Sequence, residues 1–245
     1  MEYEDYNSKI IDSWIREGWE WGKPVEHSVI EKAREGDWSV LLTPTKSVPH
    51  SWFLPFEGLD VLGLASGGGQ QMPIFASLGA RCTVLDYSEL QLESEKAVAR
   101  REGYSIRCVR ANMAEPLPFA DGSFDLIFHP VSNCYIRDVY PLWRECYRVL
   151  RKGGRILAGL DNGINYIVDE NHERIVRGLP FDPIAENAEL PAGEAYEFSH
   201  SAEEQIGGQL KAGFTLLDIY SDTNGYGRLD KLGIPSFWAT LAEKR

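Results

Sequence analysis

Short apolar segments alternate with segments of helical periodicity from residue 59 onward. The apolar segments cover residues 59–64, 82–85, 106–109, 124–128 and 155–160. Short, continuous apolar strands that alternate with helices are typical of a parallel sheet, because helices then cover both of its faces. The alternation therefore predicts a doubly wound α/β sheet.

Capping signals and glycines mark the predicted helices of this part of the chain. A capping box at residues 88–91 opens one helix, and its charged run 93–102 is interpreted as a solvated face. A helical stripe over residues 138–150 follows the fourth apolar segment. We expect Gly153 and Gly154 to end that helix.

Two further strands are predicted near the end of the chain. A second capping box at residues 201–204 opens a helix that ends at Gly213. Residues 214–220 and 237–241 then have strand character, and a short polar loop joins them, so we expect antiparallel neighbours. The whole chain thus predicts a seven-stranded, mostly parallel sheet.

The first part of the chain is expected to form a cap on this sheet. Residues 5–36 have the apolar spacing of two helices, and residues 37–57 form a connector that contains prolines and large aromatic side chains. We therefore divide the chain into an N-terminal helical cap and connector (1–57) and a main domain (58–245). Within the main domain, residues 161–200 are interpreted as an insertion on the substrate side.

The composition argues against several kinds of partner. The formal net charge is −12 at pH 7, so the chain should repel nucleic acids and anionic membrane surfaces. No apolar run has the length of a membrane span, and the acidic N-terminus lacks the apolar segment of a signal peptide. The four cysteines do not have the spacing of metal ligands. We therefore expect a reduced, cytoplasmic protein without a bound metal; the oligomeric state is not predicted.

A glycine-rich turn follows the first apolar strand, where residues 61–70 read VLGLASGGGQ. Gly67 and Gly69 allow a ligand to approach the backbone closely, and the N–H groups of the following helix start can bind an anion. Asp86 ends the next strand, and its carboxylate can accept two hydrogen bonds from a ribose diol. The turn and the acid together predict a ligand that contains adenosine.

The turn departs from the two common phosphate-binding motifs. Met72 occupies the last position of the dinucleotide fingerprint G-x-G-x-x-G/A, which argues against a bound pyrophosphate. The chain also contains no G-K-[ST] sequence, so a P-loop is not predicted. An adenosine ligand that carries a carboxylate but no phosphate fits the turn better.

The order and spacing of four sequence blocks resemble one known family. Besides the turn and Asp86, residues 112–125 read NMAEPLPFADGSFD and residues 148–154 read RVLRKGG. In this arrangement the chain is similar to class I S-adenosylmethionine-dependent methyltransferases, closest to the small-molecule, type-11-like methyltransferase domain. The resemblance implies a Rossmann-like methyltransferase fold and S-adenosylmethionine as the cofactor, with S-adenosylhomocysteine as the product.

The resemblance also implies a role for each residue that matches a family position. The turn would hold the methionine end of the cofactor, Asp86 would accept the ribose hydroxyls, and the remaining residues would contact the adenine or pass close to the methyl group. The implied cofactor-binding residues are Ala65, Ser66, Gly67, Gly69, Asp86, Tyr87, Asn112, Met113 and His129. The chain departs from the family pattern at Gly63, where an acid is usual, and at Ala65, where a glycine is usual.

The acceptor side is less clearly marked in the sequence. Methyl transfer depends mainly on positioning and on exclusion of water, so a catalytic dyad is not required. His129 and Asn133, just past the fourth strand, are the candidate catalytic residues, and whether His129 is a general base or a structural residue stays open. Other candidates for the pocket are Tyr135, Trp14, Trp19, Trp21, His27, Lys46, Tyr166, His172 and Tyr196.

We therefore predict a methyltransferase (EC 2.1.1.-) that acts on an unidentified small-molecule acceptor. Two alternatives remain at this point. One is a cofactor-binding module or sensor without transfer activity, which the absence of an acid at Gly63 supports. The other is an NAD(P)-dependent oxidoreductase, against which Met72 argues.

Overall fold

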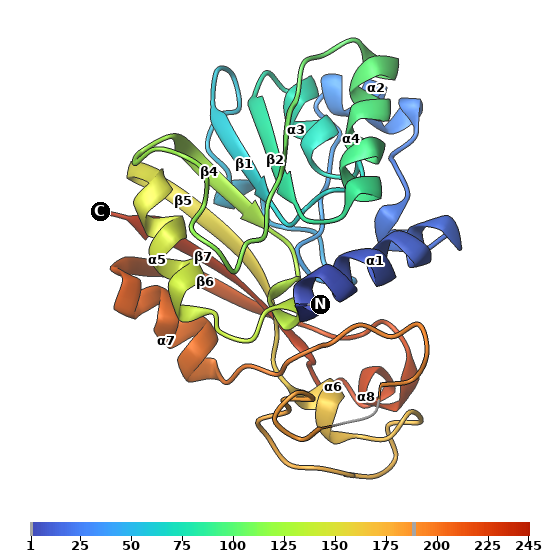
Figure 1. Ribbon diagram of the computed structural model, residues 1–245. Coiled ribbons are helices and arrows are strands. Elements are labelled where there is room, and N and C mark those ends of the chain that lie inside the picture. The colour runs from blue at the N-terminus through green and yellow to red at the C-terminus, as the bar shows by residue number, and fades with distance from the viewer. Residues whose placement is uncertain (1, 188–189) are drawn as a thin grey trace.

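A seven-stranded sheet forms the centre of the computed structural model, which describes residues 2–187 and 190–245 (Figure 1). The strand order is β3-β2-β1-β4-β5-β7-β6. The strands are β1 (Asp60–Leu64), β2 (Arg81–Asp86), β3 (Arg107–Arg110), β4 (Phe124–His129), β5 (Leu150–Asp161), β6 (Phe214–Asp222) and β7 (Phe237–Lys244). Strand β7 is antiparallel to both of its neighbours, and the other pairs are parallel. The predicted fold class is thereby confirmed, including the antiparallel pair at the end of the chain.

Helices flank the sheet, and α1 and α2 precede its first strand in the chain. They are α1 (Tyr3–Arg16), α2 (His27–Arg34), α3 (Met72–Ser77), α4 (Glu89–Glu102), α5 (Tyr140–Val149), α6 (Ile164–Ile167), α7 (Ala202–Ala212) and α8 (Gly227–Lys231). Short 3-10 turns lie at Glu20–Gly22, His50–Trp52 and Asn133–Tyr135. Figure 1 shows α5 and α7 side by side, whereas α6, α8 and their loops form a lobe beyond one end of the sheet.

The sheet is buried on both faces, as the apolar strands require. In β1, Val61 contributes to one hydrophobic core, and Leu62 and Leu64 contribute to the other. The first core also contains Phe75 of α3 and Trp52 of the connector, so the connector is packed into the same core as the sheet. This packing follows from the alternation of side chains along a strand, which places successive residues on opposite faces.

The end of α5 differs from the sequence prediction. The helix ends at Val149 and strand β5 begins at Leu150, so Gly153 and Gly154 lie within the strand and do not end the helix. Leu150 is already extended, with φ −75° and ψ 144°, and it pairs with Phe124 of β4. Pairing with the sheet therefore stops the helix earlier than the glycines would.

The buried indole of Trp143 joins α5 to α7. Its Nε1–H donates to the carbonyl of Glu204 at 3.0 Å, and a Cβ at Gly208 would lie only 2.9 Å from the same nitrogen. Trp143→Ala should therefore lower the free energy of unfolding by about 3–5 kcal/mol, because a large cavity remains. Urea denaturation checks this value, and Leu217→Ala, at a residue that is 41% exposed, should cost less than about 1 kcal/mol.

Candidate cofactor and acceptor site

The glycine-rich turn and Asp86 are in direct contact. Gly67 N–H donates to Asp86 Oδ2 at 3.0 Å, and Ala65 N–H donates to the carbonyl of Leu85 at 2.8 Å. A Cβ on Gly67 would lie 2.5 Å from Gln91 Cβ and 2.9 Å from Asp86 Oδ2. Only glycine allows this approach, since real Cβ atoms do not come so close to other heavy atoms.

Asp86 is held by backbone donors, and no cation pairs with it in the part of the chain that the structure describes. Its Oδ1 accepts from Ser88 N–H at 3.0 Å, and its Oδ2 accepts from Gly67 N–H. Burial raises the pKa of Asp86 to about 6, against the opposing effect of these backbone hydrogen bonds. A buried carboxylate with this arrangement can accept further hydrogen bonds from neutral hydroxyl donors.

The start of the turn provides an unpartnered polar atom. The Ser66 hydroxyl is buried and has no hydrogen-bond partner among the described residues. A Cβ at Gly63 would clash with this hydroxyl and would lie 2.9 Å from Met72 Sδ. Gly63 therefore leaves room for the Ser66 side chain, in the place where the resembling family usually has an acid.

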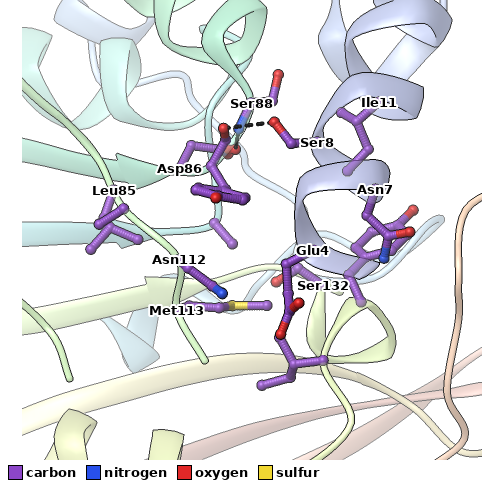
Figure 2. Close-up of a pocket in the computed structure, with 15 residues that line it drawn as sticks. Glu4, Asn7, Ser8, Ile11, Leu85, Asp86, Ser88, Asn112, Met113 and Ser132 are labelled. Atoms are coloured by element: carbon purple, nitrogen blue, oxygen red, sulfur yellow. Dashed lines mark hydrogen bonds between the residues drawn. The ribbon is translucent and has the colours of Figure 1, made fainter. Parts of the chain in front are cut away.

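A small cavity of about 60 Å³ lies between α1 and the ends of β2 and β3. Figure 2 shows Ser8 and Glu4 of α1 on the side of Asp86, Asn112 and Met113, and Asn7 and Ile11 of the same helix also line the cavity. Asn112 Oδ1 accepts from Ala114 N–H at 2.9 Å, which orients its amide. Tyr87 also lines the cavity, and its hydroxyl donates to Asp5 of α1 at 2.6 Å. The structure thus brings the predicted adenine-side residues together.

Sequence reasoning missed the contribution of α1 to this cavity. Ser8 Oγ donates to the carbonyl of Tyr87 at 2.9 Å, and Asp12 Oδ1 accepts from Ser88 Oγ at 2.5 Å. The lining residues of α1 follow the spacing of one helical face, and Asn7 and Ser8 are buried although they are polar. This polar stripe on a predicted helix is the signal that could have identified the face.

A much larger cavity of about 710 Å³ adjoins the turn. Its lining includes Ala65, Ser66 and Gly67 of the turn and Asp86 at the end of β2, and Ile11 of α1 lines both cavities. On the other side it is lined by Trp19, Trp21, Pro130, Ser132, Cys134, Tyr135, Asp161, Tyr166, His172 and Glu197, among others. Residues of the cap and of the 161–200 segment therefore meet in one space next to the turn.

Several candidates from the sequence lie outside this lining. Trp14 contacts the ring of Trp19 and donates to the carbonyl of Gly193 at 2.8 Å, and Tyr196 exchanges backbone hydrogen bonds with the side chain of Asn7. His27 contacts Glu102 at 2.9 Å. Lys46 Nζ donates to the carbonyl of Ser221.

His129 and Asn133 contact each other and line neither cavity. His129 is fully buried; its Nδ1–H donates to the carbonyl of Leu64 at 2.8 Å, and its Nε2 lies 2.6 Å from Asn133 Oδ1. Asn133 Nδ2 in turn donates to Gln205 Oε1 at 2.8 Å. Burial lowers the pKa of His129, and both of its ring nitrogens have protein neighbours.

These residues and cavities suit a nucleoside with a polar, non-phosphate end, because the turn provides a free hydroxyl and a close backbone approach. Residues 62–158 match a methyltransferase domain. The chain is 42% identical over 232 residues to an uncharacterized methyltransferase, YbaJ, of Bacillus subtilis, covering 90% of this chain and 91% of the relative. The chain therefore belongs to the S-adenosylmethionine-dependent methyltransferases, and S-adenosylmethionine is its cofactor.

Other relatives and solved structures agree with this assignment. The chain is 30% identical to the ubiquinone/menaquinone biosynthesis C-methyltransferase UbiE of Klebsiella pneumoniae, over 69% of this chain and 71% of the relative. An S-adenosylmethionine-dependent methyltransferase from Mesorhizobium loti has the same fold, with a TM-score of 0.62, 19% identity and coverage of 79% of this chain and 94% of that one.

A second solved structure shares the fold and contains the reaction product of this class of enzyme. Geranyl diphosphate C-methyltransferase from Streptomyces coelicolor, with S-adenosylhomocysteine bound, gives a TM-score of 0.54 at 20% identity and covers 77% of this chain and 72% of that one. The methyltransferase assignment leaves no support for the oxidoreductase alternative. Within residues 2–187 and 190–245, no helix has the length and apolarity needed to cross a membrane.

Sequence reasoning also missed Glu95 beneath the turn and placed it wrongly on a solvated helix face. Its side chain is fully buried in α4, and its Oε1 accepts from Gly69 N–H at 2.8 Å. Its Oε2 is buried without a hydrogen-bond partner in the described part of the chain. Burial, with a smaller contribution from the nearby Asp86, raises the pKa of Glu95 to about 8 against the opposing effect of the Gly69 hydrogen bond. Glu95 thus supports the turn. Its charged neighbours in the sequence concealed this role.

This raised pKa predicts a pH-dependent stability. Because the folded state binds the Glu95 proton more tightly than the unfolded state, the contribution to stability is complete below about pH 4.5 and is lost as the pH rises toward about 8. Glu95→Gln removes this loss. The free energy of unfolding of the variant, relative to that of the wild type, should therefore rise by up to about 1.4 kcal/mol per pH unit between pH 5 and 8. Urea unfolding at several pH values measures the difference.

Glu93→Gln on the exposed face of the same helix is the matched control. Glu93 pairs with Lys96, which lowers its pKa, so it is ionised in both states between pH 5 and 8, and over this range the free energy of unfolding of the variant should run parallel to that of the wild type. If Glu95→Gln also runs parallel to the wild type, the carboxyl of Glu95 is ionised in the folded protein and our account of its burial is wrong.

Proposed function

We propose that this methyltransferase acts on a small-molecule acceptor that occupies the large cavity. The observation that carries the proposal is that Ala65, Ser66, Gly67 and Asp86 line the same space as residues of the 161–200 segment. A volume of about 710 Å³ suits a metabolite. The net charge of −12 supports the same conclusion, because it disfavours a nucleic-acid acceptor.

The chain's own residues would bind and orient the cofactor, which supplies an electrophilic methyl group on a sulfonium sulfur. Ala65, Ser66, Gly67 and Gly69 would hold its methionine end, with the unpartnered Ser66 hydroxyl as one contact. Asp86 would accept the ribose hydroxyls. Tyr87, Asn112 and Met113 would enclose the adenine, and α1 would cover it through Asn7, Ser8 and Ile11.

The methyl-transfer step would depend on positioning and on exclusion of water. Trp19 and Trp21 line the large cavity and would close it on the cap side. His129 and Asn133 are the catalytic candidates from the sequence. The contact between their side chains and their hydrogen bonds to Leu64 and Gln205 support a role in holding β4 next to the turn, close to the cofactor.

The same proposal assigns roles to the parts of the chain. Residues 1–57 would act as the cap and connector, residues 58–245 as the methyltransferase domain, and residues 161–200 as the insertion that shapes the acceptor side. All four cysteines are free thiols, and three of them are buried. Unpaired thiols are typical of a reducing compartment, which supports a cytoplasmic location.

Asp86→Ala tests the assignment of the ribose site. Losing two hydrogen bonds to a charged acceptor should weaken the binding of S-adenosylhomocysteine by about 2–4 kcal/mol, which is roughly a 30- to 1,000-fold rise in Kd. Isothermal titration calorimetry measures the affinity. An unchanged affinity in a variant whose circular dichroism spectrum shows a native fold would contradict the assignment.

Asp37→Ala provides the control, since this exposed carboxylate lies in neither cavity lining. It should leave the affinity for S-adenosylhomocysteine unchanged. Transfer of a labelled methyl group from S-adenosylmethionine into a small-molecule extract, in which nucleic acid is absent, tests the acceptor class. Label that appears only after nucleic acid is added would contradict the proposed class of acceptor.

A further inference from the structure

The acceptor side of the large cavity is acidic, and its described lining contains no lysine or arginine to neutralise the carboxylates. Asp161 at the end of β5 and Glu197 before α7 both line it, and Glu170 lies at its exposed side. Among the described lining residues there is no lysine or arginine, and His172 is the one basic side chain. Buried carboxylates are normally paired with a cation, so this combination is unusual.

A chain of neutral donors holds Asp161 in place. Its Oδ1 accepts from Gly163 N–H at 2.6 Å, and its Oδ2 accepts from Asn165 Nδ2 at 3.0 Å. Asn165 Oδ1 accepts from Asn224 Nδ2 at 2.9 Å, and Asn224 Oδ1 accepts from the Ser236 hydroxyl at 2.9 Å. The Asp161 side chain is therefore fixed at the cavity wall while its charge remains uncompensated.

Glu197 is the second fixed carboxylate of the same wall. Its Oε2 accepts from the Tyr166 hydroxyl at 3.2 Å. Burial raises the pKa of Glu197 to about 7, and the nearby Asp161 contributes to this rise. Burial also raises the pKa of Asp161 to about 6. These shifts have the direction expected of carboxyls that have no cation nearby.

The remaining walls suit an organic cation better than a metal ion. Tyr135, Tyr166, Tyr226 and Phe237 line the cavity, and aromatic faces attract cations. Across residues 2–187 and 190–245, no group of three or more His, Cys, Asp or Glu side chains converges as a metal site would require. The cavity of about 710 Å³ is also far larger than a metal ion needs.

We propose that the methyl acceptor is an organic amine, which binds as its ammonium ion against Asp161 and Glu197. This inference rests on the proposed function, because it assumes that the acceptor occupies the large cavity. It identifies the acceptor atom as nitrogen and assigns its recognition to two residues that the sequence did not single out.

The chemistry of an ammonium ion requires one proton to leave before methylation. The Glu197 carboxylate takes this proton, which leaves a neutral amine with a free electron pair. The amine nitrogen uses that pair to form a bond to the methyl carbon; the methyl–sulfur bond breaks, and its electron pair stays on sulfur as the neutral thioether of S-adenosylhomocysteine. The methylated nitrogen then carries the positive charge, opposite the ionised Asp161.

Matched probes that differ only in charge test the proposal. The full chain is saturated with S-adenosylhomocysteine and titrated calorimetrically with an amine, an alcohol and a carboxylate on each of three skeletons: butyl, 2-phenylethyl and 2-(indol-3-yl)ethyl. On at least one skeleton the amine should bind at least ~10-fold more tightly than the alcohol, and the carboxylate should bind more weakly than both.

Variants connect this preference to the two residues. Asp161→Asn and Glu197→Gln keep the side-chain shape, and each should reduce the preference for the amine over the alcohol to about threefold or less. Glu203→Gln, an exposed carboxylate on α7, is the matched control and should keep the full preference. Thermal melting of all variants confirms that they are folded.

Three results would overturn the proposal. They are an alcohol or carboxylate that binds as tightly as the amine on every skeleton, no binding of any amine in the millimolar range, or an amine preference that persists in both variants. Failure of the proposed function gives a different result, because S-adenosylhomocysteine would then fail to bind in the initial titration or labelled methyl would appear only on added nucleic acid.

Discussion

The hydrogen bond from Gly67 N–H to Asp86 Oδ2 is the contact on which the site depends. It joins the turn after β1 to the last residue of β2, two parallel neighbours whose carboxyl ends meet at one edge of the sheet. The approach is so close that a Cβ on Gly67 would overlap both Gln91 and Asp86. The backbone conformation of the turn and the orientation of the acid therefore determine each other; Asp86 lines both cavities, and Gly67 lines the larger one.

Buried carboxyls held by neutral donors recur throughout the site. Asp86 and Glu95 accept from backbone N–H groups of the turn region, and Asp161 accepts from Gly163 N–H and an asparagine amide. Burial raises the pKa of each of them. Among the described residues these three carboxyls form no ion pair, whereas Asp60, nearer the surface, pairs with Arg81.

Most of the fold could be predicted because its signals are local. The apolar strands, the capping boxes at Ser88 and Ser201 and the αL glycines at Gly103 and Gly213 all correspond to elements of the structure. The end of α5 could not be predicted from its glycines, since pairing of Leu150 with β4 ends the helix first. Whether a local signal or sheet pairing ends a helix depends on the tertiary structure, which the local sequence does not reveal.

The candidate site could be predicted only where its residues belong to short sequence motifs. The turn, Asp86, Asn112 and Met113 belong to recognisable blocks, and the structure brings them together around the cavities. Glu95 was hidden in a charged run, because its burial depends on how α4 packs under Gly69. The polar face of α1 and the presence of Asp161 and Glu197 on one cavity wall likewise depend on segments that are distant in the sequence.

Helix α1 contributes to both cavities, since Ile11 lines both. On one side the helix is tied to the Tyr87 carbonyl through Ser8, and on the other Asn7 bonds both backbone groups of Tyr196. A displacement of this helix would therefore change the walls of both cavities at once.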